Sequence, residues 1–380
     1  MKTPFRLTCL SFLLSLGPLA AADLHPVVAL ELGVSEGNPR NTEGDFVALK
    51  DGGFLYVYTR FRGGGSDHDR ADLVSRISRD GGKTWSAEDQ PVVGNEGGLN
   101  VMSVSLLRLH DGRIALFYLQ KNSLTDCRPV VRFSTDEAAT WSEPTSIIPD
   151  AEIGYYVLNN DRVVQLGDGR LLAPVAKHHQ PGQEKADWNG AVGCYFSDDG
   201  GNTWQSPKQL DQAFDSAGKR VAAQEPGVVE LQDGRVLLWV RTGAGEFYRA
   251  HSGDRGQTWT PLVPMGVATP QSPASLERLP ESGELVLVWN DHSDLPVAER
   301  KLRTPLSVAV STDEGESWSA GHIIEPDPMG WYCYTAIECT DEHLLLAYVA
   351  GTQAPGKRLS VSRITRIPLT ELRALNPTAK

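Results

Sequence analysis

Glu225 and Arg241 could act together on an anionic ligand, because they stand at the ends of two short runs that suit a β-hairpin. The runs are residues 225–231 and 236–241, and Asp233-Gly234 between them favours a tight turn. Sixteen residues across such a hairpin could bring both side chains to the same rim. A guanidinium binds a carboxylate through two parallel hydrogen bonds, which a lysine cannot do. The plainer alternative is a solvated glutamate and a surface arginine at strand ends.

A polar, glycine-rich loop at residues 60–73 holds a second group of candidates, namely Arg62, Asp67, Asp69 and Asp72. A carboxyl group that donates a proton during catalysis needs a raised pKa. An acidic loop is more often just solvated, so that interpretation stays open as well.

Tyr334 is the third candidate, in residues 333–337. A tyrosine normally has a pKa near 10 and is a poor nucleophile, so a neighbouring base such as Glu225 would have to activate it. Trp331 and Tyr332 compete for the same position. Aromatic residues in a β-rich chain more often serve packing.

Five copies of the pattern S-x-D-x-G-x-T-W organise the rest of the chain. They end at Trp85, Trp141, Trp204, Trp259 and Trp318, which lie 56, 63, 55 and 59 residues apart. Ala138 replaces the glycine in the second copy, and Ser317 replaces the threonine in the fifth. A period of this length indicates a repeat architecture.

A second repeated unit lies between these boxes: two short β-prone runs joined by a two-residue turn. The six turns are Asp51-Gly52, Asp111-Gly112, Asp168-Gly169, Asp233-Gly234, Ser282-Gly283 and Asp341-Glu342. No 11-residue stretch after the first 22 residues shows sustained helical periodicity. The sequence therefore predicts an all-β, six-bladed β-propeller of about 58 residues per four-stranded blade. We expect residues 25–32 to close the last blade by pairing with residues 359–364, which protects the edge strands.

The residue types of the boxes indicate a structural role. Serine and aspartate can accept hydrogen bonds from nearby backbone amides, and tryptophan packs between strands. Sugar stacking on each tryptophan is the less favoured alternative. The pattern resembles the Asp-box, or bacterial neuraminidase repeat, of the sialidase-like propellers, and the resemblance covers most of the chain after residue 22. Asp-boxes also occur in propellers with other functions, so a site must carry the functional argument.

The resemblance implies a role for each candidate residue. A sialidase cuts a sugar that carries a carboxylate at its anomeric carbon, and uses a tyrosine nucleophile. On this basis Tyr334 is the nucleophile, Glu225 its base and Asp67 the general acid, with Asp69 as second choice. The residues implied to bind the substrate are Arg40, Arg62, Arg241 and Arg303. Of these, Arg40, Arg241 and Arg303 form the clamp that binds the sugar carboxylate. Arg300 and Arg62 are the alternatives for Arg40 or Arg303 in this clamp.

Three features depart from the sialidase pattern or have no role in it. The Arg-Ile-Pro motif is absent at Arg40, and Val349 stands where the family has a glutamate that steadies an arginine. Glu43 could substitute for that glutamate. Polar residues at 155–162 and 177–179 could line the entrance of the same substrate-binding site, but the resemblance gives them no role.

Residues 1–22 read as a cleavable secretory signal, with Lys2 and Arg6 before an apolar run. We expect residues 23–380 to form a single propeller domain that is secreted or periplasmic and monomeric. The net charge is −12 and becomes −14 without the signal, which holds two basic and no acidic residues. This charge argues against nucleic acid and anionic membrane as partners. Four cysteines remain, more often small buried groups than disulfides, and no motif points to a metal or another cofactor.

Together these features predict an exo-glycosidase that hydrolyses terminal α-linked sialic acid with retention. Two alternatives remain: a hydrolase or lyase acting on a different anionic sugar, or a non-catalytic propeller that binds a glycan with a terminal acidic sugar.

Overall fold

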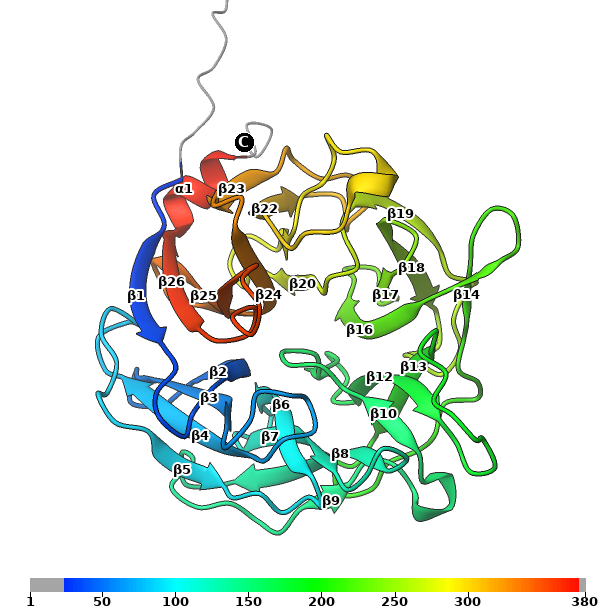
Figure 1. Ribbon diagram of the computed structural model, residues 1–380, viewed down its shortest axis with the longest axis horizontal. Coiled ribbons are helices and arrows are strands. Elements are labelled where there is room, and N and C mark those ends of the chain that lie inside the picture. The colour runs from blue at the N-terminus through cyan, green and yellow to red at the C-terminus, as the bar shows by residue number, and fades with distance from the viewer. Residues whose placement is uncertain (1–23, 376–380) are drawn as a thin grey trace, which may run out of the picture.

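The computed structural model describes residues 24–375, whose strands form sheets around a common axis (Figure 1). The chain is nearly all β and forms a β-propeller, as predicted. The expected leader, residues 1–22, lies outside the described residues. No helix in residues 24–375 is long and apolar enough to cross a membrane.

Within that range the sheets divide into six blades, each defined here by its strands. Blade 1 comprises β2 (Asn41–Ala48), β3 (Phe54–Phe61), β4 (Ala71–Ser78) and β5 (Gln90–Val93). Blade 2 comprises β6 (Asn100–Arg108), β7 (Ile114–Lys121), β8 (Cys127–Ser134) and β9 (Thr145–Ser146). Blade 3 comprises β10 (Tyr155–Val157), β11 (Val164–Gln165), β12 (Leu171–His179) and β13 (Ala191–Ser197). A single residue pair, Tyr155 with Cys127, joins blades 2 and 3 into one sheet.

The other three blades follow the same order. Blade 4 comprises β16 (Ala223–Glu230), β17 (Val236–Thr242), β18 (Glu246–Ser252) and β19 (Val263–Ala268). Blade 5 comprises β20 (Ser275–Arg278), β21 (Leu285–Trp289), β22 (Leu306–Ser311) and β23 (His322–Glu325). Blade 6 comprises β24 (Gly330–Cys339), β25 (His343–Thr352), β26 (Ser362–Pro368) and β1 (Val27–Leu32). Smaller elements are β14 (Ala213–Phe214), β15 (Arg220–Val221), η1 (Asp150–Glu152), η2 (Val297–Glu299) and α1 (Leu369–Ala374).

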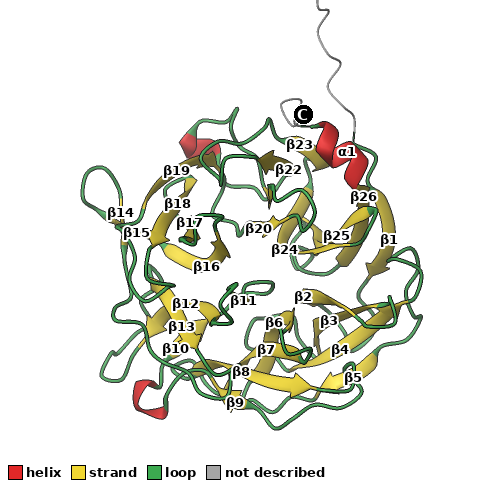
Figure 2. Cartoon of the chain, turned by 180° about the vertical axis from the view of Figure 1, so that it is seen from behind, coloured by secondary structure: helices red, strands yellow, loops and turns green. Residues whose placement is uncertain are grey.

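The N-terminal strand β1 closes the ring by pairing antiparallel with β26, from Val27 opposite Arg366 to Leu32 opposite Ser362. This is the closure predicted from the sequence, although β26 extends four residues beyond the predicted range. Helix α1 follows β26 directly and lies beside it (Figure 2). The pairing makes β1 the edge strand of blade 6.

The apolar core lies mainly between neighbouring blades. Tyr56 and Tyr58 of blade 1 pack with Leu345 and Ala347 of blade 6, and all four are buried. A similar cluster joins blades 1 and 2. Each large side chain buried this way contributes about 1.5–3 kcal/mol. This packing fixes the angle between blades, and therefore the positions of their inner strands.

The five boxes form the same hydrogen-bonded turn, as their folding interpretation predicts. In the first, the Ser78 hydroxyl donates to Asp80 Oδ1 and accepts from the Gly82 N–H, each at 2.9 Å. Asp80 also accepts the N–H of Thr84 at 2.9 Å. Equivalent bonds recur in the boxes that begin at Ser134, Ser197, Ser252 and Ser311. The boxes therefore belong to the scaffold.

The first strands of four blades share a bulge that the sequence did not reveal. In β2, β6, β16 and β24 the pairing register shifts, and one residue adopts a left-handed φ: Glu43 (50°), Ser103 (60°), Glu225 (51°) and Tyr334 (58°). A non-glycine residue in this region costs about 1–3 kcal/mol and is retained where the surrounding structure holds it. Bulges of this kind redirect a side chain. All four side chains line the cavity described next.

Candidate active site

A cavity of about 380 Å³ lies where blades 1, 2, 3, 4 and 6 approach one another. Asp67, Glu225, Arg241 and Tyr334 line it, all four of which were chosen from the sequence. None of the five box tryptophans does so among the described residues. The chemistry of this cavity therefore comes from unrepeated residues.

Arg40 is held in a buried network at the edge of this cavity. Its side chain exposes only 3% of its surface, and Nη2 donates to Glu43 Oε1 at 3.2 Å. Nη1 donates to Asp67 Oδ1 at 2.5 Å. The guanidinium lies 4.4 Å from the centre of the Phe61 ring, and Glu43 accepts a further bond from the Ser103 hydroxyl. Arg40 is thus fixed between two carboxylates and an aromatic face.

Glu43 of β2 neutralises Arg40, which directly precedes that strand, while position 349 carries a buried valine. Burial alone would lower the pKa of Arg40, but the charges of Glu43 and Asp67 raise it. Burial also raises the pKa of Glu43, and Arg40 opposes that rise. The Arg-Ile-Pro motif is absent at Arg40, but a nearby carboxylate, Glu43, forms an ion pair with this arginine.

Glu225 and Arg241 meet across the hairpin formed by β16 and β17. Arg241 Nη1 donates to Glu225 Oε2 at 2.6 Å, and each side chain exposes 12% of its surface. Gln224 lies opposite Arg241 in the register, immediately before the bulge that turns Glu225 toward the cavity. Within the described structure, no hydrogen bond joins Glu225 to the Tyr334 hydroxyl.

Arg303 lies against the aromatic residues of β24. The centre of its guanidinium is 5.5 Å from the Tyr334 ring and 5.2 Å from the Trp331 ring. Its Nη2 donates to the carbonyl oxygen of Gln271 at 3.3 Å. Arg303 is not among the residues that line the cavity, but its guanidinium lies beside Tyr334, which does line it.

Tyr334 keeps its proton in the free protein. Burial and the charge of Glu225 raise its pKa well above the ordinary value, and Arg303 opposes the rise. A phenolate is therefore not formed in advance. Attack by this oxygen requires a base to accept its proton as the new bond forms, and Glu225 is the nearby carboxylate that affects Tyr334 most.

Asp67 is more exposed than the other residues of this group, with 60% of its side-chain surface accessible. Burial raises its pKa, but the charge and hydrogen bond of Arg40 outweigh this effect and hold it below the ordinary value. Asp67 is therefore ionised in the free protein, which is the wrong state for a proton donor. Loss of the Arg40 contact would raise its pKa.

Two side chains of blade 2 bind the backbone of the loop that contains Asp67. Lys121 Nζ donates to the carbonyl oxygen of Asp67 at 2.7 Å, although Lys121 exposes only 2% of its surface. Asn100 Nδ2 donates to the carbonyl oxygens of Asp67 and Asp69 at 2.9 and 2.8 Å. Lys121 also brings a buried positive charge to the cavity wall.

The structure does not bring Arg62 or Asp69 to the cavity. Arg62 forms an ion pair with Asp72 and exposes 61% of its side chain. The carboxylate of Asp69 caps the N–H of Ser66 at 2.7 Å within its own loop. Arg300 donates to the carbonyl oxygens of Leu295 and Gly245. Arg62, Asp69 and Arg300 therefore bind other groups outside the cavity.

Several lining residues had no predicted role. Tyr155 and His178 belong to segments that the sequence marked as polar or aromatic without a function. Lys121, Ser103 and Trp188 carried no signal, because they come from strands and loops whose place depends on neighbouring blades. None of the four cysteines in residues 24–375 forms a disulfide.

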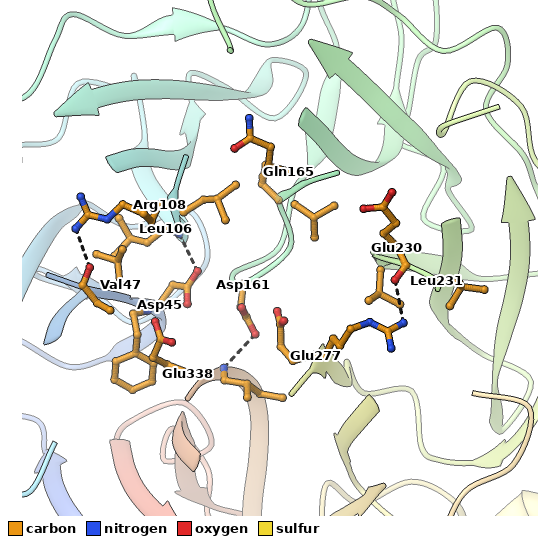
Figure 3. Close-up of a pocket in the computed structure, with 18 of the residues that line it drawn as sticks. Asp45, Val47, Leu106, Arg108, Asp161, Gln165, Glu230, Leu231, Glu277 and Glu338 are labelled. Atoms are coloured by element: carbon orange, nitrogen blue, oxygen red, sulfur yellow. Dashed lines mark hydrogen bonds between the residues drawn. The ribbon is translucent and has the colours of Figure 1, made fainter. Parts of the chain in front are cut away.

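A second cavity, of about 750 Å³, has a different character (Figure 3). Asp45, Asp161, Glu277 and Glu338 are among the residues that line it. Burial raises the pKa of Glu277 and of Glu338 to about 7. No group of three or more His, Cys, Asp or Glu side chains in the described chain is arranged to hold a metal ion. No residue predicted for catalysis or substrate binding lines this cavity.

The family model of the BNR repeat-like domain matches residues 56–346. A sialidase of Micromonospora viridifaciens is 28% identical over 314 residues, which are 74% of this chain and 45% of that protein. A sialidase of Bacteroides fragilis is 24% identical over 329 residues, 77% of this chain and 57% of that protein. The chain thus spans about half the length of these relatives.

Solved structures share the fold. A leech intramolecular trans-sialidase, complexed with 2,7-anhydro-Neu5Ac, matches with a TM-score of 0.69 at 15% identity, over 92% of this chain and 71% of that one. A protein of unknown function from Dyadobacter fermentans matches with a TM-score of 0.66 at 19% identity, over 90% of this chain and 98% of that one. At these identities the likeness concerns the fold alone.

Proposed function

Because the chain belongs to the BNR repeat-like domain family, within the sialidase superfamily, we propose that it hydrolyses terminal α-linked sialic acid with retention of configuration. The grouping of three arginines around one tyrosine and two carboxylates supports this reaction most directly. Arg40, Arg241 and Arg303 each contact a side chain that lines the cavity. A carboxylated sugar needs such a clamp, because the whole protein carries a net charge of −12.

The first chemical step uses Tyr334 as a nucleophile. Its oxygen bonds to the anomeric carbon while its proton passes to Glu225, and the bond to the leaving oxygen breaks. Asp67 donates a proton to that oxygen. A neutral nucleophile suits this substrate, because a carboxylate nucleophile would be repelled by the carboxylate of the sugar.

The second step releases the sugar. A water molecule attacks the anomeric carbon, Asp67 accepts its proton, and Glu225 returns a proton to the departing Tyr334 oxygen. Two displacements at one carbon retain its configuration.

Substrate binding also prepares Asp67. The sugar carboxylate takes the place of Asp67 at the Arg40 guanidinium, so Asp67 loses the ion pair that lowers its pKa. A second carboxylate nearby raises that pKa further. Asp67 is then protonated when the leaving oxygen needs a proton.

The direct test is release of free sialic acid from α2,3- and α2,6-sialyllactose by the purified protein, with Tyr334→Phe as the inactive variant. Tyr334→Phe keeps the ring that packs against Arg303, so it should still bind the glycan. If neither glycan is cleaved under any condition, hydrolysis of sialosides is excluded.

A different anionic sugar is the second candidate, because Lys121 lines the cavity as a further cation beside Arg241. Glycosides of glucuronic acid and sulfated hexoses should therefore be assayed in parallel. Cleavage of one of these, without release from sialosides, would favour this candidate. Binding without cleavage, unchanged in Tyr334→Phe and Asp67→Asn, would indicate a glycan-binding propeller.

A further inference from the structure

A short segment of blade 3, residues 159–162, lies between the two cavities. It links β10 to β11, and Asn159, Asn160 and Arg162 expose only 2%, 0% and 3% of their surface. Asn159 lines the candidate active site, whereas Asp161 lines the second cavity. The segment therefore reaches the centre of the propeller, where it meets the inner strands of other blades.

The Asn160 side chain bonds to two of these blades at once. Its Nδ2 donates to the carbonyl oxygen of Gly44 in blade 1 at 3.0 Å and to that of Tyr334 in blade 6 at 3.1 Å. Gly44 directly follows Glu43, so both acceptors lie at bulges with a left-handed φ. One buried amide thus joins the bulge of the proposed nucleophile to the bulge that carries the ion-pair partner of Arg40.

The residue after Asn160 reaches the same group of strands. The Asp161 N–H donates to the Val104 carbonyl oxygen at 3.2 Å, directly after the bulge at Ser103. Asp161 Oδ2 accepts a bond from the Ile337 N–H of β24, also at 3.2 Å (Figure 3). These bonds fix the backbone of the segment, so Asn160 meets its two acceptors from a fixed position.

We propose that Asn160 is a positioning residue that holds Tyr334 in its place relative to Arg40. A left-handed φ at a tyrosine is strained, and it persists only where neighbouring groups hold it. The bond to the Tyr334 carbonyl oxygen acts on that strained residue directly, and the same amide holds the first strand of blade 1. Asn160 does not line the cavity, so it acts through Tyr334 and not on the sugar. This inference rests on the proposed function, since it concerns the step in which the Tyr334 oxygen attacks.

The experiment replaces Asn160 by leucine, which has a similar shape but no donor. A displacement of about 1 Å in a reacting group can cost about 10²-fold in rate, so kcat for α2,3-sialyllactose should fall by about that factor. KM should stay unchanged, because the clamp arginines and the cavity lining are left in place. Asn290→Leu is the matched control: Asn290 exposes 1% of its surface and donates to the Pro305 carbonyl oxygen at 3.1 Å, but this bond stays within blade 5. Its kcat should stay near that of the wild type.

An equal fall in kcat in both variants would overturn the proposal, and so would an unchanged kcat in Asn160→Leu. A rise in KM without a fall in kcat would overturn it as well, because Asn160 would then shape the pocket for the sugar. If the leucine variant does not fold, Asn160→Ala and Asn290→Ala replace the pair with the same expected results. The smaller side chain leaves room for water at the two carbonyl groups.

Hydrogen exchange of the folded proteins separates this inference from the proposed function. If the wild type does not cleave sialyllactose, the proposed reaction fails, and peptides that contain residues 41–45 and 331–337 then decide the inference. Faster exchange of both peptides in Asn160→Leu than in Asn290→Leu supports the role of Asn160 in holding the two bulges. Equal exchange in the two variants, or faster exchange throughout the chain, refutes it.

Discussion

Replacing Glu43 by glutamine removes the charge that neutralises Arg40 inside the cavity wall. The two side chains each expose 3% of their surface, and 3.2 Å separates their charged atoms. At an effective dielectric constant of about 20, unit charges at this distance attract by about 5 kcal/mol. Desolvation, which raises the pKa of Glu43, offsets part of this attraction, and Arg40 keeps Asp67 as a second partner. We therefore expect the free energy of unfolding to fall by about 2–3 kcal/mol, near the low end for a broken buried ion pair.

Urea unfolding at pH 7, followed by tryptophan fluorescence, measures this loss as a lower midpoint at an unchanged slope. The double variant Arg40→Met with Glu43→Gln should recover much of the loss, because no unpaired charge remains buried. Glu316→Gln is the matched control: Glu316 bonds to Arg249 at 2.8 Å but exposes 54% of its side chain, so its loss should stay below about 1 kcal/mol. The reasoning fails if Glu43→Gln costs no more than this control, or if the double variant is less stable than the single one.

Three further predictions concern catalysis and pH. Tyr334→Phe should abolish turnover in the sialyllactose assay while leaving the dissociation constant of the glycan nearly unchanged; residual turnover near wild type would contradict its role. Asp67→Asn should lower kcat/KM for sialyllactose by about 10²–10⁴. It should impair an aryl sialoside much less, because a phenolate leaves without help; equal losses would exclude Asp67 as the acid. The free energy of unfolding should fall as pH rises from about 4.5 to about 7, because Glu277 and Glu338 keep protons in the folded state that the unfolded chain has released. Glutamine at both positions should flatten this dependence in urea titrations, and an unchanged slope would argue against it.

The scaffold was largely predictable because its signals are local. A turn such as Asp51-Gly52 needs only its own residues, and glycine there adopts a φ of 82°. Each box closes through bonds within seven residues, from Ser78 to Thr84 in the first copy. The proximity of Glu225 and Arg241 was also accessible, since one hairpin contains both.

The rest of the site depends on contacts between blades. Lys121 reaches the Asp67 backbone from the neighbouring blade, and no pattern along the chain indicates that contact. Trp188 comes from a loop held by bonds to its own and the next blade. Arg62 was chosen because its loop resembles the sialidase loop that carries the acid and a substrate-contacting arginine, but in the structure Arg62 pairs with Asp72. The bulges at Glu43 and Tyr334 likewise have no signature in residue type.

Strand β1, the first strand of the described residues, pairs with β26 and leads across the seam between blade 6 and blade 1. Strand β1 lies in blade 6, and the chain then enters β2 of blade 1, so one covalent segment joins the two blades. Tyr334 belongs to one side of that seam and Arg40 with Glu43 to the other. The segment from β1 to β2 therefore helps to hold the proposed nucleophile and Arg40 together, in addition to the apolar packing of Tyr56 and Tyr58 against Leu345 and Ala347. The assembly of the site is thus coupled to the outer edge strand of blade 6, which β26 and β25 separate from β24.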